Sequence, residues 1–258
     1  MLPVSLYDEV EIRKIAGETP RGDAPTIRLT CDDPLVPDGE KNLAHRAAAI
    51  LLKKARRRDR VEIRIHKNIP VGAGLGGGST DAAAVLVGLN RLLKLGYSAR
   101  HLEKIGVAIG ADVPFFIQAR PARARGIGER LSRLCAVPRR WLVIVYPGFA
   151  VSTAWVYRNL LLKLTKHSVN TSIAAPLRDL EKVGKLLVND LETVTLKRYS
   201  RIKVLKSRLI CMGAVAASMS GSGSAVFGIF ASKREAEFAF RRLRQEEGAQ
   251  AFLARVLS

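Results

Sequence analysis

Glycines dominate one short segment of the sequence, and hydroxyl side chains follow them. Five of the seven residues from Gly72 to Gly78 are glycine, and Ser79 and Thr80 come directly after. Glycine lets the backbone adopt positive φ values and lets another group approach closely. An apolar helical pattern begins at the same point, and backbone N–H groups at the start of a helix attract anions. The segment therefore predicts a cradle for phosphate groups.

Three other interpretations of this segment can be weighed from the residues. It is not a Walker A loop, because no Gly-Lys-Ser or Gly-Lys-Thr ends it. Gly72, Gly74 and Gly77 match G-x-G-x-x-G, but a dinucleotide site also needs a strand and a ribose-binding acid after the helix. A tight turn without a ligand is the third, although each glycine costs about 0.5–1 kcal/mol of chain entropy. A phosphate cradle therefore explains five glycines better than packing does.

Two further loops carry polar side chains. Asp112 stands before Val-Pro-Phe-Phe, at the expected edge of a core, where a carboxylate can take a proton from a substrate hydroxyl. The same residue is also compatible with an ordinary turn, since aspartate is a common turn former. From Ser218 to Ser224 the sequence SMSGSGS offers a second row of small donors, which by itself also fits a flexible turn.

The segments that position these loops alternate between strand and helix patterns. Strand patterns lie at 4–12, 26–31, 61–66, 141–146 and 224–230. Helix patterns lie at 42–55, 79–95, 98–109, 152–164, 176–188, 199–210 and 233–245. Asn42 is suited to cap the first helix, and 109–118 is expected to be a loop that leads into a short strand. The composition changes near residues 135–141, so we expect domains at 1–138 and 139–258.

The composition points to a folded protein with an excess of positive charge. The 258 residues are 48% hydrophobic and carry a formal net charge of +20. Such a charge fits a nucleic-acid partner, a solubility habit or an attraction for anionic metabolites. We expect no nucleic-acid partner, because no aromatic residues are interleaved with the basic clusters at 53–60 and 120–140. The apolar runs are too short to span a membrane and no secretory signal opens the chain, so a cytoplasmic location is expected.

The cysteines give no sign of a metal or redox site. Cys31, Cys135 and Cys211 lie far apart and form no C-x-x-C pair. Zinc-binding and redox spacings are therefore absent, and we expect all three to be buried as small hydrophobic residues.

Together and in this order, the three loops resemble those of the GHMP kinases. The similarity is closest to one family of them, the 4-diphosphocytidyl-2-C-methyl-D-erythritol kinases. It rests on SLYDEVEI, NLAHRAA, IPVGAGLGGGSTDAAAVLVGLNRLL, IGADVPFF, RGIGE, PGFAVSTAWVY, NDLE and ASMSGSGSAVFGIF. The resemblance covers nearly the whole sequence and implies an α/β (α+β) fold of two subdomains. The N-terminal subdomain would be ribosomal-protein-S5-domain-2-like and the C-terminal one ferredoxin-like.

The resemblance also implies a reaction. Kinases of this family move the γ-phosphate of ATP to the 2-hydroxyl of 4-diphosphocytidyl-2-C-methyl-D-erythritol, a step of the non-mevalonate route to isoprenoids. The expected cofactors are ATP and Mg²⁺, and the expected partners are the two small-molecule substrates, with no membrane, for a monomer or homodimer. A GHMP kinase for another small alcohol, such as homoserine or mevalonate, is the alternative, against which the SLYDE and VSTAWVY segments argue.

Individual residues match positions that work in the family. Asp112 matches the catalytic aspartate, which acts as general base. The implied ATP-binding set is Val71, Gly72, Ala73, Gly74, Leu75, Gly76, Gly77, Gly78, Ser79 and Thr80, with Asn42 and Lys67 near the adenine. The implied substrate-binding set is Thr153, Tyr157, Ser220, Gly221, Ser222 and Gly223, with Tyr157 stacking on cytosine. Ser79 is a candidate metal ligand, and the other protein ligands of the metal are unknown.

The sequence departs from the family pattern at its start. The family begins earlier, with a strand whose lysine is expected to pair with the catalytic aspartate, followed by a D-G-Y-H type turn. Neither pattern is found here. We favour a start assigned too late, so that the true protein is longer, because every downstream motif is intact. The competing explanation is a truncated chain that binds ATP but is catalytically impaired.

Overall fold

The computed structural model describes residues 1–16, 26–126, 128, 130–134, 137–160, 187–246 and 248–257. Contacts divide the chain into two compact units. Unit 1 comprises Met1, Tyr7–Val71 and Gly76–Arg133, and unit 2 comprises Leu2–Leu6, Gly72–Leu75 and Leu134–Ser258. Most of the helix predicted at 176–188, and the end of the one predicted at 152–164, lie outside the described residues. The functional limits 1–138 and 139–258 stay a prediction.

Unit 1 is built on a three-stranded sheet. Its central strand β3 (Val61–His66) pairs antiparallel with β1 (Glu9–Lys14) and parallel with β2 (Ile27–Cys31). The residues of β3 alternate between buried and less buried positions, which is the period-two pattern of a half-buried strand. The strands predicted at 26–31 and 61–66 are confirmed. The strand predicted at 4–12 begins later than expected, because Val4 forms only an isolated bridge.

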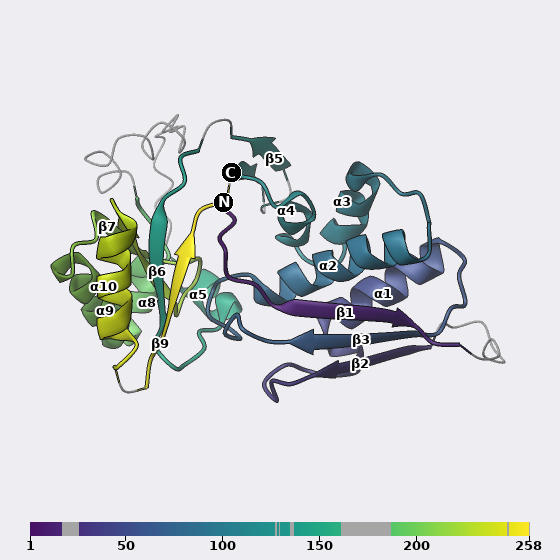
Figure 1. Ribbon diagram of the computed structural model, residues 1–258, viewed down its shortest axis with the longest axis horizontal. Coiled ribbons are helices and arrows are strands. Elements are labelled where there is room, and N and C mark those ends of the chain that lie inside the picture. The colour runs from purple at the N-terminus through teal and green to yellow at the C-terminus, as the bar shows by residue number, and fades with distance from the viewer. Residues whose placement is uncertain are drawn as a thin grey trace. The chain divides into compact units, whose positions relative to one another are not determined.

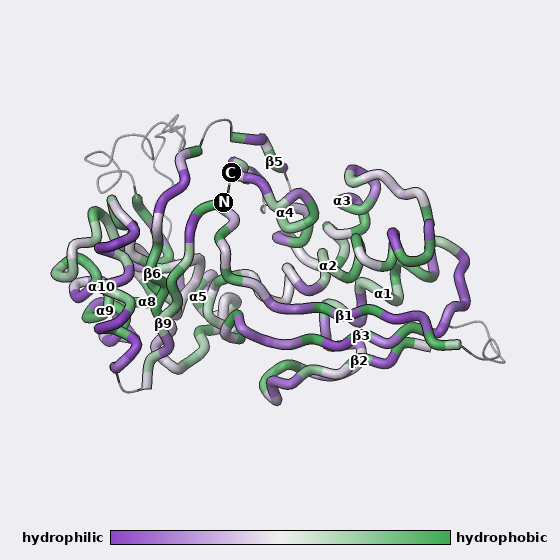
Figure 2. The backbone as a smooth tube through the Cα atoms, in the orientation of Figure 1, coloured by the Kyte–Doolittle hydropathy of each residue, from purple (hydrophilic) through white to green (hydrophobic). Residues whose placement is uncertain are grey.

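Two long helices, α1 (Leu43–Lys54) and α2 (Gly77–Leu92), cover the apolar face of this sheet (Figure 1). Together with α3 (Ala99–Val107) they enclose the core of unit 1. α1 begins where predicted, since the Ala44 N–H donates to Asn42 Oδ1 at 2.8 Å. Ser98 caps α3 in the same way. Hydrophobic and hydrophilic residues alternate along β1 and β3, which is the pattern of a sheet with one face buried (Figure 2).

The expectation of a loop at 109–118 is wrong for most of its length. Val113–Gln118 forms the short helix α4, with Pro114 in its first turn. Proline suits the first turn of a helix because its missing N–H would have no partner there. The chain then forms an antiparallel hairpin of β4 (Ala122–Arg125), the predicted short strand, and β5 (Arg130–Arg133), which was not predicted.

Unit 2 is built on a four-stranded antiparallel sheet in the order β7–β8–β6–β9. Its strands are β6 (Trp141–Tyr146), β7 (Ala216–Met219), β8 (Val226–Phe230) and β9 (Gln250–Arg255). Its described helices are α5 (Thr153–Asn159), α8 (Glu192–Arg198), α9 (Ser200–Cys211) and α10 (Lys233–Leu243). With α9 before β7 and α10 between β8 and β9, this is the order of a ferredoxin-like β-α-β-β-α-β unit. The expected α/β fold with a ferredoxin-like C-terminal subdomain is confirmed.

The strand β6 lies at the centre of unit 2 and is buried on both faces. Val143 and Val145 pack in the core that α9 and α10 cover, whereas Leu142 and Ile144 pack in a second core on the opposite face. This explains why the strand reads as a continuous apolar run rather than an alternating one. The helix α10 begins with a capping box formed by Ser232 and Glu235. β7, β9 and α8 were not predicted.

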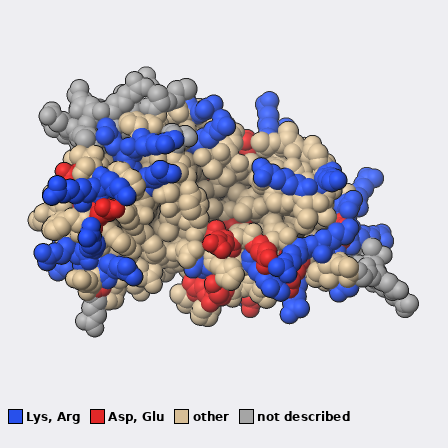
Figure 3. Space-filling model, in the orientation of Figure 1, with Lys and Arg blue, Asp and Glu red and all other residues tan. Residues whose placement is uncertain are grey.

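The expectations about the positive charge, membrane spans and cysteine burial can be compared with the described residues. Basic side chains are scattered over the face drawn in Figure 3 instead of forming one patch. No helix among these residues is long and apolar enough to cross a bilayer. Cys211 is exposed and Cys31 is partly buried, so the expectation that all the cysteines are buried is wrong for Cys211; Cys135 lies outside the described residues.

Candidate functional site

The glycine-rich segment is divided between the units by its contacts. Gly72–Leu75 packs in unit 2, and unit 1 resumes at Gly76. Gly72, Gly74 and Gly76 all have positive φ values, which residues with a Cβ rarely adopt. A Cβ on Gly74 would lie 2.2 Å from the backbone oxygen of Ser220. The fold therefore requires glycine at these positions, whatever the loop binds.

Conformation and packing account for more of the glycines than the sequence argument allows. A Cβ on Gly77 would lie 3.1 Å from Ile69 Cγ2, which is tighter than usual. Only Gly78 has ordinary space, with 3.7 Å to Leu43 Cδ1 and no positive φ. The number of glycines alone therefore does not separate a phosphate loop from a tight turn, and the distinction depends on what the loop presents.

What the loop presents is an uncapped helix N-terminus. Gly76 occupies the N-cap of α2 without a side-chain cap, and the first turn contains no acidic residue. The first N–H groups of a helix have no partner within it, and the aligned peptide dipoles add positive partial charge. The Thr80 hydroxyl donates back to the Gly76 oxygen at 3.0 Å, so it serves the helix itself. This end of α2 is suited to bind phosphate.

Asp112 follows a segment that approaches the same end of α2. A Cβ on Gly110, two residues earlier, would be 3.8 Å from Ser79 Oγ. Asp112 is the N-cap residue of α4, yet its carboxylate makes no capping hydrogen bond, which disfavours the ordinary turn-former interpretation. Partial burial of its carboxyl group raises the pKa of Asp112 and the N-terminal ammonium group opposes this, while the residue as a whole is exposed. An aspartate with a raised pKa is a better proton acceptor.

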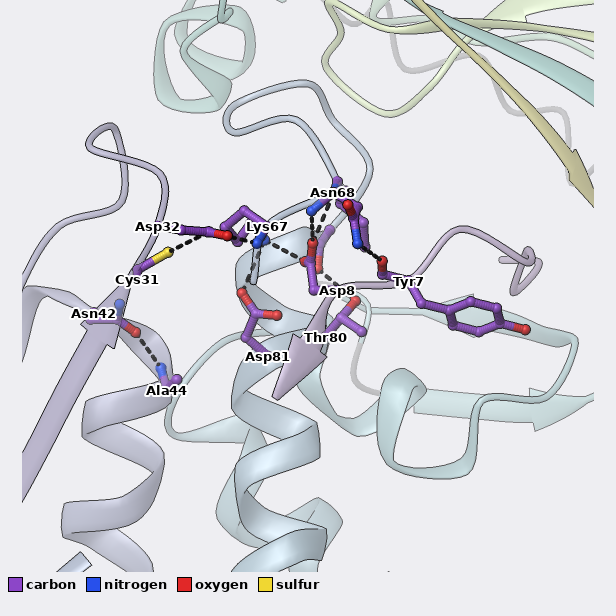
Figure 4. A network of polar contacts seen from close by, with 12 residues as sticks. Tyr7, Asp8, Cys31, Asp32, Asn42, Ala44, Lys67, Asn68, Thr80 and Asp81 are labelled. Carbon is purple, nitrogen blue, oxygen red and sulfur yellow. Dashed lines mark hydrogen bonds and ion pairs between the residues drawn. The ribbon is translucent and has the colours of Figure 1, made fainter. Parts of the chain in front are cut away.

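Lys67 lies in a buried network with two carboxylates (Figure 4). Its Nζ donates to Asp81 Oδ2 at 3.0 Å and to Asp8 Oδ2. The three side chains are only 4%, 5% and 1% exposed. Asp8 Oδ1 also accepts the backbone N–H groups of Asn68 and Ile69, at 2.7 and 2.8 Å. The lysine thereby links the segment before β1, the end of β3 and the first turns of α2.

The network holds two buried carboxylates and one ammonium group. Burial raises the pKa of Asp81 to about 7, and the Asp8 charge adds to this while Lys67 opposes it. Burial alone would lower the pKa of Lys67, but Asp81 and Asp8 outweigh it and raise that pKa. Asp81 Oδ1 is buried and has no hydrogen-bond partner. A proton on Asp81 removes one negative charge and so relieves the charge imbalance, and it lowers the cost of leaving this oxygen unpaired because the group is then neutral.

The two residues expected near adenine are both engaged within unit 1. Asn42 accepts from the Ala44 N–H and donates from Nδ2 to the Pro37 oxygen at 3.0 Å, and it is 5% exposed. The Lys67 ammonium group is held by the two carboxylates. Their assignment to the adenine site stays a prediction, and the observed contacts are structural.

The second glycine turn, Ser220–Gly223, packs on the Gly72–Leu75 segment within unit 2. Ser220 Oγ donates to the Gly74 oxygen at 2.9 Å. The turn is closed by the Gly223 N–H, which donates to the Ser220 oxygen at 2.9 Å. Next to it, the Ala225 N–H donates to the Ala73 oxygen at 3.0 Å. The structure therefore brings together two of the sequence-predicted loops, and the interpretation of a merely flexible turn does not fit these contacts.

Thr153 and Ser222, which are both expected to bind substrate, lie together in unit 2. Thr153, at the start of α5, has its Oγ1 2.8 Å from Ser222 Oγ. Tyr157 lies one turn further along α5 and is 60% exposed. An exposed aromatic ring offers a face on which a base can stack, but its stacking on cytosine stays a prediction.

Sequence reasoning missed several polar residues that hold these loops. Asp8 and Asp81 stood inside segments used for the resemblance but received no role, and the same is true of Asn189 and Glu192. One signal was available for Asp81, since an acidic side chain among buried apolar helix positions needs a partner. Among the residues that the structure describes, no three His, Cys, Asp or Glu side chains are grouped to hold a metal ion.

The sequence matches two family models, one in each half of the chain. It matches "GHMP kinases N terminal domain" over residues 42–120 and "GHMP kinases C terminal" over residues 171–250. It is 49% identical over 248 residues to the 4-diphosphocytidyl-2-C-methyl-D-erythritol kinase of Citrifermentans bemidjiense, covering 96% of this chain and 85% of the relative. The enzyme of the same name from Syntrophotalea carbinolica is 48% identical over 252 residues, covering 98% and 87%.

Solved structures give the same picture. A crystal structure of 4-(cytidine 5'-diphospho)-2C-methyl-D-erythritol kinase matches with a TM-score of 0.83 and 32% identity, over 100% of this chain and 88% of that one. A homoserine kinase from Cytophaga hutchinsonii matches with a TM-score of 0.74 over 99% and 90% of the chains. Its identity of 20% supports the shared fold alone.

Proposed function

The chain belongs to the 4-diphosphocytidyl-2-C-methyl-D-erythritol kinases, a family of the GHMP kinases, and from this we propose how its residues carry out phosphoryl transfer. It is a phosphotransferase with an alcohol acceptor. Its reaction moves the γ-phosphoryl group of ATP to the 2-hydroxyl of 4-diphosphocytidyl-2-C-methyl-D-erythritol. The observation that carries the assignment of roles is Asp112, whose carboxylate makes no capping hydrogen bond and which follows Gly110, a residue that lies near Ser79 in the uncapped first turn of α2.

The glycine-rich segment binds the ATP phosphates in this proposal. Phosphoryl transfer needs chiefly the positioning of the reactants and the stabilisation of negative charge. The first N–H groups of α2, at Gly77 and Gly78, supply positive partial charge without a competing side-chain cap. The backbone of Val71–Leu75 completes the loop. Asn42 and Lys67, proposed near the adenine, act through the structure of unit 1 rather than through free polar groups.

Asp112 acts as the general base. Its carboxylate accepts the proton of the 2-hydroxyl while the hydroxyl oxygen forms a bond to the γ-phosphorus. The bond between that phosphorus and the ADP oxygen breaks, and ADP leaves with the electron pair. The raised pKa of Asp112, caused by burial, brings its basicity closer to the working pH.

The acceptor contacts residues of unit 2 in this proposal. Thr153 and the Ser220–Gly223 turn line its binding site, and the exposed ring of Tyr157 stacks on the cytosine. When bound with the nucleotide, Mg²⁺ would supply positive charge that neutralises part of the phosphate charge. Ser79, in the first turn of α2, is the residue that would hold it through the hydroxyl oxygen. We assign the nucleotide role to a domain at 1–138 and the remaining role to 139–258.

The test is ADP release by the purified chain with Mg-ATP and the cytidylylated acceptor. The Asp112→Asn variant should lose turnover by on the order of 100-fold or more, the usual contribution of a general base. Asp38→Asn is a matched control, because Asp38 is also an exposed N-cap residue without a capping hydrogen bond but lies in a different loop. Turnover that survives in Asp112→Asn would remove Asp112 from this role.

The choice of acceptor has one competitor within the superfamily. Homoserine and mevalonate kinases share the fold, but identity to this chain is 48–49% for the two cytidylyl-acceptor kinases and 20% for the homoserine kinase. ADP release with homoserine or mevalonate, in the absence of the cytidylylated acceptor, would favour the competing function. ATP binding without turnover on any acceptor would favour a catalytically impaired chain.

A further inference from the structure

The second glycine turn of unit 2 is held by side chains from a segment that has no role so far. Asn189 and Glu192 belong to the sequence NDLE, at the start of α8. Asn189 Nδ2 donates to the Met219 oxygen at 2.9 Å and to the Gly221 oxygen at 2.8 Å. Its Oδ1 accepts the Leu191 N–H at 3.1 Å. Every polar atom of this amide is therefore used, and its orientation is fixed.

Glu192 holds the strand that leads into the same turn. Its Oε1 accepts the Met219 N–H at 2.8 Å and the Ser218 hydroxyl at 3.0 Å. Its Oε2 pairs with Lys206 of α9. One residue type could not replace the other here, because Glu192 accepts two hydrogen bonds at the strand end while Asn189 donates two at the turn.

These contacts continue to the phosphate loop. Ser220 Oγ donates to the Gly74 oxygen, and the backbone oxygens of Ser220 and Gly223 would lie 2.2 and 2.8 Å from a Cβ on Gly74. Two backbones this close must move together, since packed segments have little room to shift independently. The position of Gly72–Leu75 is thus determined by the Ser220–Gly223 turn, and that of the turn by Asn189 and Glu192.

We propose that Asn189 and Glu192 are positioning residues for the ATP phosphates, acting through the Ser220–Gly223 turn on Gly72–Leu75. Neither residue needs to touch the nucleotide. The inference rests on the proposed function only in taking Gly72–Leu75 as part of the ATP site. It does not depend on which alcohol accepts the phosphoryl group.

The test measures the affinity of the full chain for ATP directly, by calorimetry, together with the melting temperature. Asn189→Ala and Glu192→Ala should each raise the Kd for ATP by on the order of 10- to 100-fold, the loss expected when a binding loop is misplaced by about 1 Å. Glu192→Gln should keep most of the ATP affinity that Glu192→Ala loses. Its amide oxygen still accepts from Met219 and Ser218, although the ion pair with Lys206 is lost.

Glu246→Ala is the matched control for a purely structural effect. Glu246 also pairs with a basic residue of α9, Arg208 at 2.5 Å, and the two glutamates are similarly exposed, at 19% and 16%. Glu246→Ala should lower the melting temperature while leaving the Kd for ATP unchanged. The proposal is overturned if Asn189→Ala and Glu192→Ala bind ATP like wild type, if Glu246→Ala weakens binding equally, or if wild type does not bind ATP. A chain that binds ATP and responds as expected, yet does not phosphorylate the acceptor, refutes the proposed function alone.

Discussion

Two polar networks hold the two ends of the glycine-rich segment, and they use different chemistry. In unit 1, Asp8, Lys67 and Asp81 form a cluster of charges with side chains at most 5% exposed. In unit 2, Asn189 and Glu192 hold their loop mainly through hydrogen bonds to the backbone, and the one ion pair, to Lys206, is partly exposed. Buried charges lose their solvation and must balance each other, whereas amide and hydroxyl groups need only a partner. The first network should therefore be the more sensitive to loss of a member and to pH.

The largest effect should come from the same substitution made in each network. Lys67→Met leaves Asp8 and Asp81 buried without a cation, and breaking a buried pair in this way usually costs about 3–5 kcal/mol. Lys206→Met, whose lysine is 23% exposed, should cost much less, because Glu192 keeps its hydrogen bonds to the backbone and to Ser218. Urea unfolding of the two variants measures the difference. Equal losses would mean that burial of charge does not distinguish the networks.

A smaller effect should separate the two sides of the glycine segment itself. Gly74→Ala places a Cβ 2.2 Å from a backbone oxygen at a positive φ, so the loop must shift and the Kd for ATP should rise. Gly78→Ala meets only Leu43 at 3.7 Å inside α2. It should keep ATP affinity and gain about 0.5–1 kcal/mol of stability, because alanine favours a helix over glycine. Calorimetric titration with ATP and thermal unfolding together report both quantities. A Gly78→Ala chain that loses ATP affinity would place a ligand contact at that Cα.

The last effect should be a pH dependence confined to unit 1. Asp81 has a pKa raised from 3.8 to about 7 by burial, so the folded chain keeps a proton there that the unfolded chain has lost. Stability from this proton is complete below about pH 4 and is lost as the pH rises to about 7. Asp81→Asn cannot lose a proton, so its stability relative to wild type should increase across that interval. Unfolding free energies at pH 5 and pH 8 for both chains check this. Parallel pH profiles would show that Asp81 is ionised throughout.

Sequence predicted the elements whose local signals agree with their tertiary setting. Asn42 and Ser98 cap helices where expected, and the alternation of Val61–His66 and the apolar run of Trp141–Tyr146 both form strands. The helix at Val113–Gln118 was missed because six residues give too short a periodic pattern and Pro114 favours a turn as readily as a helix start. β9 was missed because QAFLAR has no clear alternation and forms a strand through its pairing with β6.

The site was predicted in part for the same reason. The glycine loops and Asp112 are contiguous motifs, so a resemblance can identify them. The network of Asp8, Lys67 and Asp81 joins residues that are 59 and 14 positions apart, and no local pattern relates them. Asn189 and Met219 are separated by 30 positions. Such contacts exist only once the fold has formed, which is why sequence reasoning assigned Lys67 to the nucleotide and no role to Asn189.

The way unit 2 is tied together also determines when it can fold. Its strand β9 lies at residues 250–255, and the Arg255 N–H donates to Ser5 Oγ across 250 positions of sequence. Contacts between distant segments form slowly, because a long loop must close before they contribute. On the ribosome, the segments of unit 1 emerge well before β9 has been synthesised. Unit 1 can therefore acquire its core during translation, whereas the sheet of unit 2 is completed only after residues 250–255 have left the ribosome.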